Sequence, residues 1–168
     1  MTTAKAIIAL GGNVGDVPAA MASTLRAFDA REDLTVVRVS KLYSTPPWGK
    51  TDQPDFINAC ALVETTLEPL ALLDLCLETE RLHGRERGER WGPRTLDLDL
   101  IDYDGRTIAD ERLELPHPRA KERAFVLRPM ADLDDQLRLG DGTVAEHQAR
   151  VADDGIRPIS ETGDWWRG

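Results

Sequence analysis

The sequence predicts an α+β fold, a single-domain α/β sandwich built around an antiparallel sheet. The chain has 168 residues, of which 41% are hydrophobic and 30% charged, as in an ordinary soluble globular domain. A chain of this length buries about two-thirds of its extended surface. Strand-like and helix-like segments mix without strict β-α-β alternation, and Asp104-Gly105 has the composition of a hairpin turn. These observations favour an antiparallel sheet over a doubly wound parallel one.

The sequence of residues 4–30 predicts a strand, a turn and a helix. The apolar run at residues 4–10 ends at Gly11-Gly12-Asn13, which is typical of a buried strand stopped by a turn. These glycines fit neither of the common phosphate-loop patterns. We therefore interpret them as a tight strand-to-helix turn, whose backbone N–H groups could still face a ligand. Asp16 followed by Pro18 predicts a helix that runs to about Ala30.

The next segments predict two strands separated by a long loop. Residues 34–43 are β-branched and partly alternating, and residues 56–66 form a second strand-like run. Three prolines and a glycine in residues 44–55 forbid regular structure. The length of this window favours a functional loop over a plain surface loop, with Trp48 as a flat wall for an aromatic ligand. Phe56 and Asn58 share one face of their strand, where the amide could bind a heteroaromatic ring or satisfy nearby backbone.

The rest of the chain predicts a helix over residues 69–83 that starts at a proline and ends before Gly84, followed by a charged loop. A strand then runs to about Tyr103, and residues 113–115 form a short strand. Residues 116–119 are a rigid break that holds a histidine between prolines. We expect a helix over 122–133 broken near Pro129, a turn at Asp141-Gly142 and a last helix over 144–151.

The sequence predicts one domain over residues 1–151 and a polar C-terminal tail over residues 152–168. The tail contains a Trp165-Trp166 pair, and we expect it to pack only locally, if at all.

Charge and cysteine usage exclude several classes of protein. The net charge is −9 and the pI is about 4.8, which argues against a general nucleic-acid binder. No apolar run approaches the ~20 residues of a membrane span, and the N-terminus lacks the features of a signal peptide. Cys60 and Cys76 lie in apolar runs, and we interpret them as small buried hydrophobic residues. We expect a cytoplasmic protein.

The most informative stretch covers residues 90–101, RWGPRTLDLDLI. Asp97 and Asp99 are two residues apart, so a strand would present both carboxylates on one face. Adjacent like charges repel each other, and Mg²⁺ bound by one or two carboxylates and substrate phosphates would resolve the repulsion. The arginines just upstream are suitable partners for those phosphates.

Two other interpretations remain open on the residues alone. A nucleic-acid or phosphoprotein binding module would use the arginines and Trp91, but it leaves the two aspartates as a repulsive pair beside the anion. A metal-dependent phosphohydrolase would use the aspartates, but it does not explain the Pro-Pro loop followed by Phe56 and Asn58. A bare charge run such as residues 85–89 is also commonly a solvated surface.

The run at residues 90–99 closely resembles the signature of the 6-hydroxymethyl-7,8-dihydropterin pyrophosphokinase family. Further ordered matches extend the resemblance to about Val151: LGGN at 10–13, YSTPP at 43–47, DQPDFINA at 52–59 and LPHP at 115–118. The resemblance implies an α+β sandwich with a ferredoxin-like arrangement. It also implies transfer of pyrophosphate from MgATP to the pterin hydroxymethyl group, with release of AMP, in folate biosynthesis.

The resemblance also implies roles for individual residues. The residues implied in catalysis are Arg85, Arg87, Asp97 and Asp99, with both aspartates holding two Mg²⁺ ions and both arginines on a loop that closes over the substrates. The residues implied in ATP binding are Glu80, Arg90, Trp91, Arg94, Leu100, His117 and Arg123. The residues implied in pterin binding are Thr45, Pro46, Trp48, Phe56, Asn58 and Phe125, with the ring between the two phenylalanines.

Three features depart from the family pattern. The arginine loop is one residue shorter than in some relatives, Trp48 replaces an aliphatic residue and Pro118 replaces a tyrosine.

The implied partners are ATP and the pterin, without nucleic acid or membrane, and the implied state is a monomer.

Overall fold

The computed structural model describes residues 2–47, 52–84, 95–153 and 155–168. Its centre is an antiparallel sheet in the order β10-β3-β4-β1-β5, with β2 also paired to β4. The strands are β1 (Ala4–Gly12), β2 (Leu34–Val39), β3 (Tyr43–Thr45), β4 (Phe56–Thr65), β5 (Asp97–Tyr103) and β10 (Arg157–Pro158). The order of β2, β4, β1 and β5 is that of the ferredoxin-like motif. The predicted α+β sandwich is confirmed.

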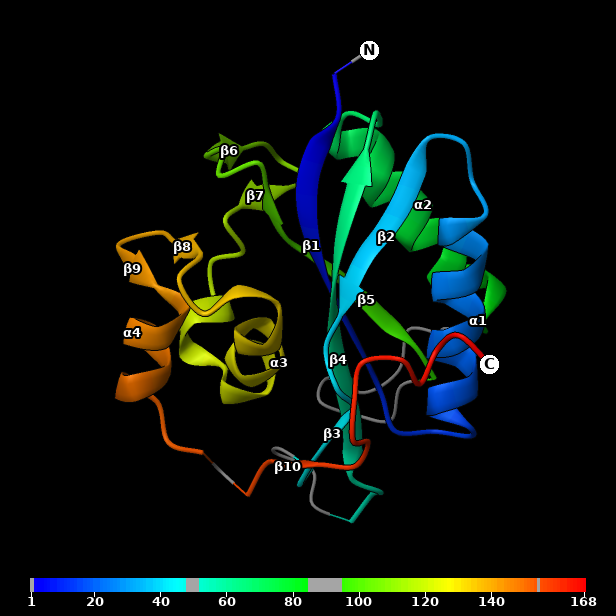
Figure 1. Ribbon diagram of the computed structural model, residues 1–168, viewed down its shortest axis with the longest axis vertical. Coiled ribbons are helices and arrows are strands. Elements are labelled where there is room, and N and C mark those ends of the chain that lie inside the picture. Colours follow the sequence, from blue (N-terminus) through cyan, green and yellow to red (C-terminus); the bar gives the residue numbers. More distant parts are fainter. Residues whose placement is uncertain (1, 48–51, 85–94, 154) are drawn as a thin grey trace.

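Helices cover both faces of the sheet (Figure 1). α1 (Val17–Asp29) and α2 (Pro69–Leu82) pack on one face. α3 (Ala124–Asp134), α4 (Val144–Arg150) and the short η1 (Ala120–Glu122) pack on the other. Two small hairpins pair β6 (Ile108–Ala109) with β7 (Glu114–Leu115), and β8 (Arg138–Leu139) with β9 (Gly142–Thr143). None of the helices in the described ranges is long and apolar enough to cross a bilayer.

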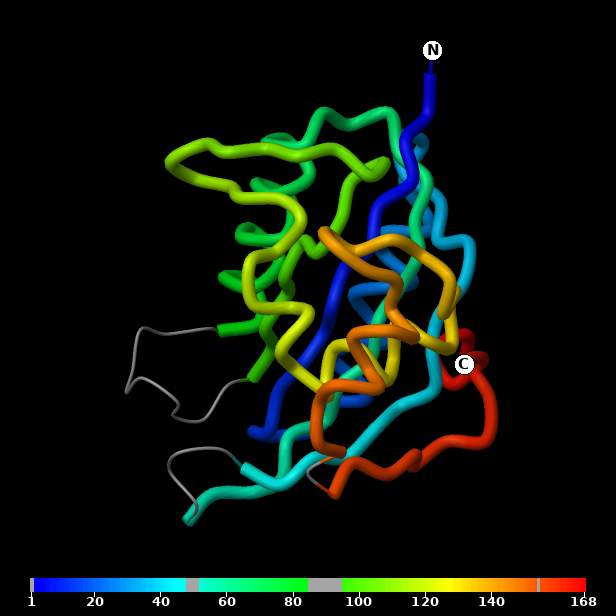
Figure 2. The backbone as a smooth tube through the Cα atoms, turned by 90° about the vertical axis from the view of Figure 1, so that its left-hand side faces the viewer, coloured from blue at the N-terminus to red at the C-terminus, as the bar shows by residue number. Residues whose placement is uncertain are grey.

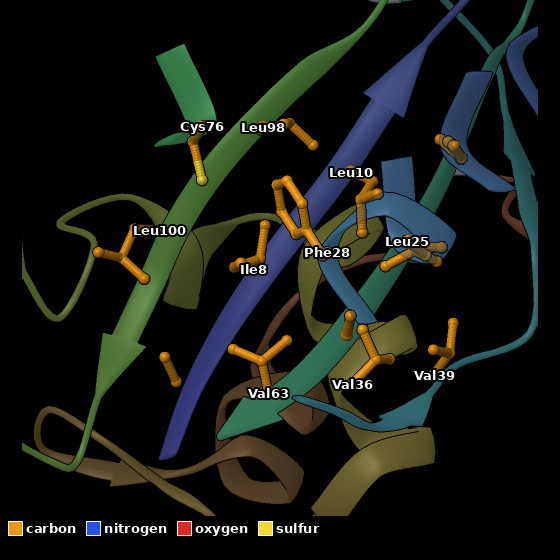
Figure 3. Packing of buried hydrophobic residues seen from close by; sticks show 14 of the residues in the cluster. Ile8, Leu10, Leu25, Phe28, Val36, Val39, Val63, Cys76, Leu98 and Leu100 are labelled. Atoms are coloured by element: carbon orange, nitrogen blue, oxygen red, sulfur yellow. The ribbon is translucent and has the colours of Figure 1, made fainter. Parts of the chain in front are cut away.

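Strand alternation divides the apolar side chains between two cores. Ile8 and Leu10 of β1 pack with Leu25 and Phe28 of α1 on one face, as Figure 3 shows. Ile7, the neighbour of Ile8, faces the α3 side instead. Because successive residues point to opposite faces, the position of a residue along its strand decides which helices it meets.

The predicted starts of α1 and α2 are confirmed. The Asp16 carboxylate accepts the backbone N–H of Ala19 at 3.1 Å, and a proline follows in the first turn of α1. A cap of this kind contributes about 1 kcal/mol. α2 begins at Pro69 and ends before Gly84, whose φ of +78° is a conformation that glycine adopts without strain.

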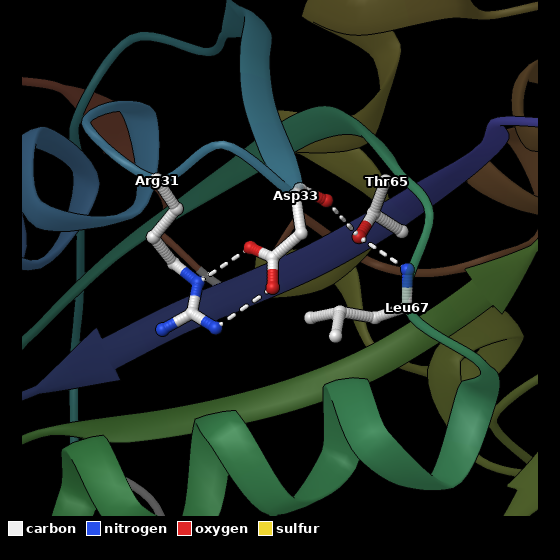
Figure 4. A network of polar contacts seen from close by, with 4 residues as sticks. All are labelled: Arg31, Asp33, Thr65 and Leu67. Atoms are coloured by element: carbon white, nitrogen blue, oxygen red, sulfur yellow. Dashed lines mark hydrogen bonds and ion pairs between the residues drawn. The ribbon is translucent and has the colours of Figure 1, made fainter. Parts of the chain in front are cut away.

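A polar network fixes one end of the sheet (Figure 4). The Arg31 guanidinium donates to both carboxylate oxygens of Asp33 at 2.7 and 2.9 Å. The Thr65 hydroxyl donates to the Asp33 carbonyl at 2.7 Å and accepts the Leu67 N–H at 3.0 Å. These bonds join the start of β2 to the end of β4. The polar residues predicted for function lie at the opposite end of β4.

The single strand predicted over residues 34–43 is wrong, because the chain breaks into β2 and β3 at residues 40–42. Ser40 is fully buried, and its hydroxyl accepts the Cys60 N–H at 2.9 Å where a backbone carbonyl would otherwise do so. Val39 lies opposite Ala61 and Tyr43 opposite Asn58. Between these two pairs, the segment that joins β2 to β3 therefore contains one residue more than β4. The break is therefore a bulge.

The expectation that the C-terminal tail packs only locally is also wrong. Figure 2 shows this segment, in red, running along the side of the molecule that carries β2 and β3. β10 pairs with β3, the Trp165 indole N–H donates to the Ser40 carbonyl at 2.8 Å, and Trp166 is buried in the core. Arg26 donates to the Trp166 carbonyl at 2.9 Å. The tail satisfies backbone groups that the break at residues 40–42 exposes.

Three smaller expectations also need correction. Pro129 is buried inside α3 and does not break it, since packing against the sheet offsets the lost hydrogen bond. Asp104 and Gly105 form a tight turn with φ values of 57° and 70°, but the strand that follows pairs with β7 and not with β5. The later turn lies one residue earlier than predicted, at Gly140, whose φ is +65°, because Gly142 already belongs to β9.

Candidate active site

Four residues lie in one row across the sheet, on the face that α3 covers. Asp97 is paired with Gly11, Gly11 with Asn58, and Asn58 with Tyr43. Directly opposed residues in antiparallel strands point to the same face. Neighbouring strands are about 4.8 Å apart, so Asp97 and Asn58 stand roughly 10 Å from each other. The row joins the predicted metal-binding aspartate to the predicted pterin-binding amide.

Asp97 and Asp99 form one end of this arrangement, on the edge strand β5. Both carboxylates are on the same strand face, where Asp97 is half-buried and Asp99 exposed. Between them, the Leu98 N–H donates to the Glu80 carboxylate at 2.7 Å, which ties β5 to α2. Two carboxylate groups are the hard oxygen ligands that Mg²⁺ accepts beside phosphate oxygens. No cluster of three or more metal-binding side chains occurs in the described ranges.

His117 lies beside β5 and is oriented by two backbone contacts. The backbone N–H of His117 donates to the Ile101 carbonyl at 2.9 Å. The backbone N–H of Arg119 donates to the ring Nδ1 of His117 at 3.2 Å. Burial lowers the pKa of His117, although the charge of Asp99 acts in the opposite direction, and Arg123 lowers it further. Since Nδ1 accepts a hydrogen bond, the neutral ring carries its proton on Nε2. His117 can therefore donate a hydrogen bond to an anion near Asp99.

Thr45, Phe56 and Asn58 form the other end. The Asn58 side-chain N–H donates to the Thr45 hydroxyl at 2.9 Å, and both side chains are buried. Thr45 lies directly opposite Phe56, so the three share a face. Phe125 stands on the first turn of α3, next to Val126, whose carbonyl contacts the Cys60 thiol of β4 at 3.7 Å. The sheet and α3 thus each supply one predicted aromatic wall.

Gly11 lies between these two ends, and sequence reasoning missed its role. It is the penultimate residue of β1, not part of a turn as predicted. A Cβ atom at this position would stand 2.8 Å from Oδ1 of Asn58, closer than real Cβ contacts allow. The glycine therefore keeps the space beside the Asn58 amide open. Its place in the middle of a sheet row could not be read from the local sequence.

Asn13 is a second residue that the sequence did not single out. Its side-chain N–H groups donate to the Gln53 side chain and to the Pro54 carbonyl, both at 2.9 Å. Asn13 is buried, so these bonds tie the end of β1 to the loop that precedes Phe56. Its position directly after the Gly-Gly pair was the available signal.

The remaining predicted site residues fall into three groups. Leu100 projects into the core on the opposite face of β5, and Glu80 is buried beneath the strand, so neither side chain joins the row. Pro46 is exposed and follows β3 directly, while Arg123 precedes α3, with its guanidinium 5.6 Å from the centre of the Phe125 ring. Six predicted residues lie outside the described ranges: Trp48, Arg85, Arg87, Arg90, Trp91 and Arg94.

The family model described as 7,8-dihydro-6-hydroxymethylpterin-pyrophosphokinase (HPPK) matches residues 7–135. The chain belongs to this family. It is 43% identical over 155 residues to a 2-amino-4-hydroxy-6-hydroxymethyldihydropteridine pyrophosphokinase of Methylorubrum extorquens, covering 92% of this chain and 98% of that one. It is also 43% identical over 138 residues to the pyrophosphokinase of Pseudomonas aeruginosa, covering 82% of this chain and 85% of the relative.

Among solved structures, the HPPK fold recurs in Plasmodium falciparum HPPK-DHPS wild type with STZ-DHP. The TM-score is 0.72 at 13% identity, over 89% of this chain and 43% of that one. The chain therefore spans less than half the length of that protein, and the likeness concerns the fold. Membership of the HPPK family also decides among the three interpretations that the sequence left open. The arginines and the aspartate pair therefore stand in a chain of the pyrophosphokinase family.

Proposed function

We propose that the chain transfers the pyrophosphoryl group of ATP to the hydroxymethyl group of 6-hydroxymethyl-7,8-dihydropterin, in folate biosynthesis. The products are the pterin diphosphate and AMP. The observation that carries the assignment of the site is the row Asp97, Gly11, Asn58, Tyr43. A phosphate-binding end and a ring-binding end face the same side of one rigid sheet, about two strand spacings apart.

The reaction requires positioning more than covalent catalysis by side chains. The pterin hydroxyl oxygen forms a bond to the β-phosphorus, while the bond from that phosphorus to the oxygen shared with the α-phosphate breaks. AMP leaves with the shared oxygen, and the hydroxyl proton passes to solvent. Holding both reactants in line lowers the barrier by removing the entropy cost of their encounter. A continuous sheet suits this task, because its two ends cannot move independently.

Asp97 and Asp99 would hold Mg²⁺ bound to the ATP phosphates, and we propose two ions. The donor set fits, since both carboxylates stand on one strand face, with Asp99 exposed and Asp97 half-buried, and Mg²⁺ favours a small number of carboxylates beside phosphates. When bound, the ions supply charge neutralisation at the phosphates and polarise the attacking hydroxyl. The protein itself fixes the two carboxylates through β5, in which the N–H of Leu98, the residue between them, is bonded to Glu80.

His117 and Arg123 would bind phosphate oxygens. His117 offers a neutral Nε2–H donor beside Asp99, and Arg123 adds a permanent positive charge at the start of α3. A helix N-terminus also favours an anion. Residues 85–94 connect Gly84 at the end of α2 to Thr95, two residues before Asp97. We propose that Arg85, Arg87, Arg90 and Arg94 of this connection complete the phosphate site, with Trp91 beside the nucleotide.

The nucleotide base would lie along the outer edge of β5. Leu98 directs its N–H to this edge, where Glu80 accepts it. Backbone groups two residues apart in a strand point the same way, so Leu100 would contact ATP through its backbone and not through its buried side chain. Glu80 then supports the strand beneath the nucleotide.

The pterin would stack between Phe56 and Phe125, with its polar edge against Asn58 and Thr45. Amide and hydroxyl groups can satisfy the donors and acceptors of a fused heterocycle. The hydrogen bond between the Asn58 and Thr45 side chains, at 2.9 Å, fixes their orientation before the ligand binds. Pro46 and Trp48 would border the same slot.

A chromatographic assay of the nucleotide products tests this function directly. The purified chain is incubated with Mg²⁺ and ATP, with and without 6-hydroxymethyl-7,8-dihydropterin, and nucleotides are separated by chromatography. AMP should form only when the pterin is present. Formation of ADP instead, or of AMP without the pterin, would contradict the assignment. Asp97→Ala serves as the inactive control.

We also propose that the protein acts as a monomer in the cytoplasm, without nucleic acid or membrane partners. Its only two cysteines are both buried free thiols, which is the state expected in a reducing compartment. Size-exclusion chromatography with light scattering, at low and high protein concentration, tests whether the protein is monomeric.

A further inference from the structure

Tyr43 adjoins the proposed pterin site but cannot touch a ligand there. It is the first residue of β3, lies directly opposite Asn58 and precedes Thr45 by two residues. All three side chains therefore point to the face covered by α3. Only 2% of Tyr43 is exposed, so any effect of this residue on a bound pterin acts through its neighbours.

The Tyr43 side chain contacts the same helix that carries Phe125. Its hydroxyl donates to Oδ2 of Asp132 at 2.6 Å, and the Arg128 guanidinium lies 5.4 Å from the centre of its ring. Residues 125, 128 and 132 are spaced by three and four positions, so they lie along one stripe of α3. The stripe that presents Phe125 to the site is thus the one that binds Tyr43.

Asp132 also binds the backbone of the strand break. Its Oδ2 accepts the Lys41 N–H at 3.1 Å as well as the Tyr43 hydroxyl. Burial and the Asp132 charge raise the pKa of Tyr43, so the phenol stays protonated and remains a donor to a charged acceptor. Hydrogen bonds to charged groups are among the stronger ones in proteins.

The opposite edge of β3 is also held. β10 pairs along it, with Arg157 opposite Ser44 and Pro158 opposite Tyr43. Asp153, just before β10, lies 3.7 Å from Arg128. Because β4 and β10 flank β3 on both sides, the strand is a fixed support, and the bond to Asp132 fixes α3 relative to it.

We propose that Tyr43, Asp132 and Arg128 form a clamp that sets the spacing between Phe125 on α3 and the Thr45–Asn58 pair on the sheet. They are positioning residues for the pterin and do not contact it. This inference rests on the proposed function, because that function assigns the two sides of the slot. Loosening the clamp should weaken pterin binding more than nucleotide binding, because Arg123 is the one proposed phosphate-binding residue in the described ranges that adjoins α3.

The chain offers a matched control for the substitution Tyr43→Phe. Tyr103 is also a buried strand tyrosine, its hydroxyl donates to the Leu67 carbonyl at 2.5 Å, and the Arg106 guanidinium lies 5.7 Å from its ring centre. It stands at the end of β5 remote from the row. Tyr103→Phe therefore removes a buried tyrosine hydrogen bond, here to a neutral carbonyl, without touching the slot.

The experiment measures binding by calorimetry, so it does not depend on turnover. Each variant is titrated with 6-hydroxymethyl-7,8-dihydropterin in the presence of Mg²⁺ and α,β-methylene-ATP, whose methylene bridge prevents pyrophosphoryl transfer. The affinity for the analogue alone and the thermal midpoint are measured on the same samples. Tyr43→Phe and Asp132→Asn should each weaken pterin binding about 3- to 30-fold, which is part of the roughly 10- to 150-fold that one hydrogen bond to a charged group supports.

Three further results are expected. Affinity for the ATP analogue should fall less than affinity for the pterin, since among the proposed ATP-binding residues in the described ranges only Arg123 adjoins α3. Tyr103→Phe should leave pterin affinity unchanged even where it lowers the thermal midpoint. The double variant Tyr43→Phe/Asp132→Asn should bind pterin no more weakly than the worse single variant, because both remove one interaction.

Several outcomes would overturn the clamp. These are unchanged pterin affinity in Tyr43→Phe and Asp132→Asn, equal losses for pterin and nucleotide, or an equal pterin loss in Tyr103→Phe. A wild-type chain that binds the pterin but forms no AMP would contradict the proposed function alone. The binding comparison between the variants would then still decide the clamp.

Discussion

Replacing Gly11 by alanine adds one methyl group at the point where the two ends of the site meet. The new Cβ would stand 2.8 Å from Oδ1 of Asn58 and 3.7 Å from the Ile57 carbonyl. The first distance is too short for any real contact, so the Asn58 amide must move. Asn58 is buried and bonded to Thr45 at 2.9 Å, which leaves it little freedom to do so.

The cost can be worked out from these contacts. Rotating the Asn58 amide away from its preferred rotamer costs about 0.5–1.5 kcal/mol. Losing its bond to Thr45 costs about another 0.5–1.5 kcal/mol. A total of about 1–3 kcal/mol corresponds to a loss of roughly 5- to 150-fold in pterin affinity. The nucleotide end should be affected less, because the nearest atoms to the added methyl group belong to β4.

Steady-state formation of AMP, with each substrate varied in turn, gives both KM values. Gly11→Ala should raise KM for the pterin far more than KM for ATP. The same change in an Asn58→Ala background serves as the control, because the clashing amide is then absent. If Gly11→Ala leaves the pterin KM unchanged, or raises it equally in both backgrounds, the clash is not the cause.

Four further predictions concern the rest of the molecule. Asp97→Ala and Asp99→Ala should each lower turnover about 100-fold or more without lowering the thermal midpoint, since they relieve repulsion; near-normal turnover would remove the metal assignment. Trp166→Ala should cost about 3 kcal/mol in urea unfolding, as for a buried aromatic, and a loss below about 1 kcal/mol would mean that the tail is not docked. Burial raises the pKa of Asp102, so its charge opposes folding at neutral pH and Asp102→Asn should raise the thermal midpoint by about 2 °C; a lower midpoint would refute this. The pKa of His117 in the ligand-free protein should lie below its ordinary 6.5 by NMR titration, so its contribution to stability is complete above pH 6.5 and is lost as the pH falls toward the lower value; a measured pKa above 6.5 contradicts this.

Local sequence signals predicted most of the elements, because their causes are local. Asp16 with Pro18, and Pro69 with Gly84, mark helix ends through capping and backbone conformation within a few residues. Alternation likewise put Asp97 and Asp99 on one face of a strand. The family motifs added the chemistry. The break at Ser40 and the continuity of α3 through Pro129 were missed, since both depend on partners distant in the chain.

The sequence by itself therefore determined the α+β class, the elements that carry the site and the kind of chemistry they perform. Only the tertiary structure decided which residues share a row, because strand register brings together Asp97, Gly11 and Asn58 from three separate segments. It also decided that the polar tail pairs with β3 through β10 and buries Trp166 in the core, where buried area and backbone hydrogen bonds outweigh the low hydrophobicity of the segment. Such pairings depend on the packing of the whole sheet, and no local pattern contains that information.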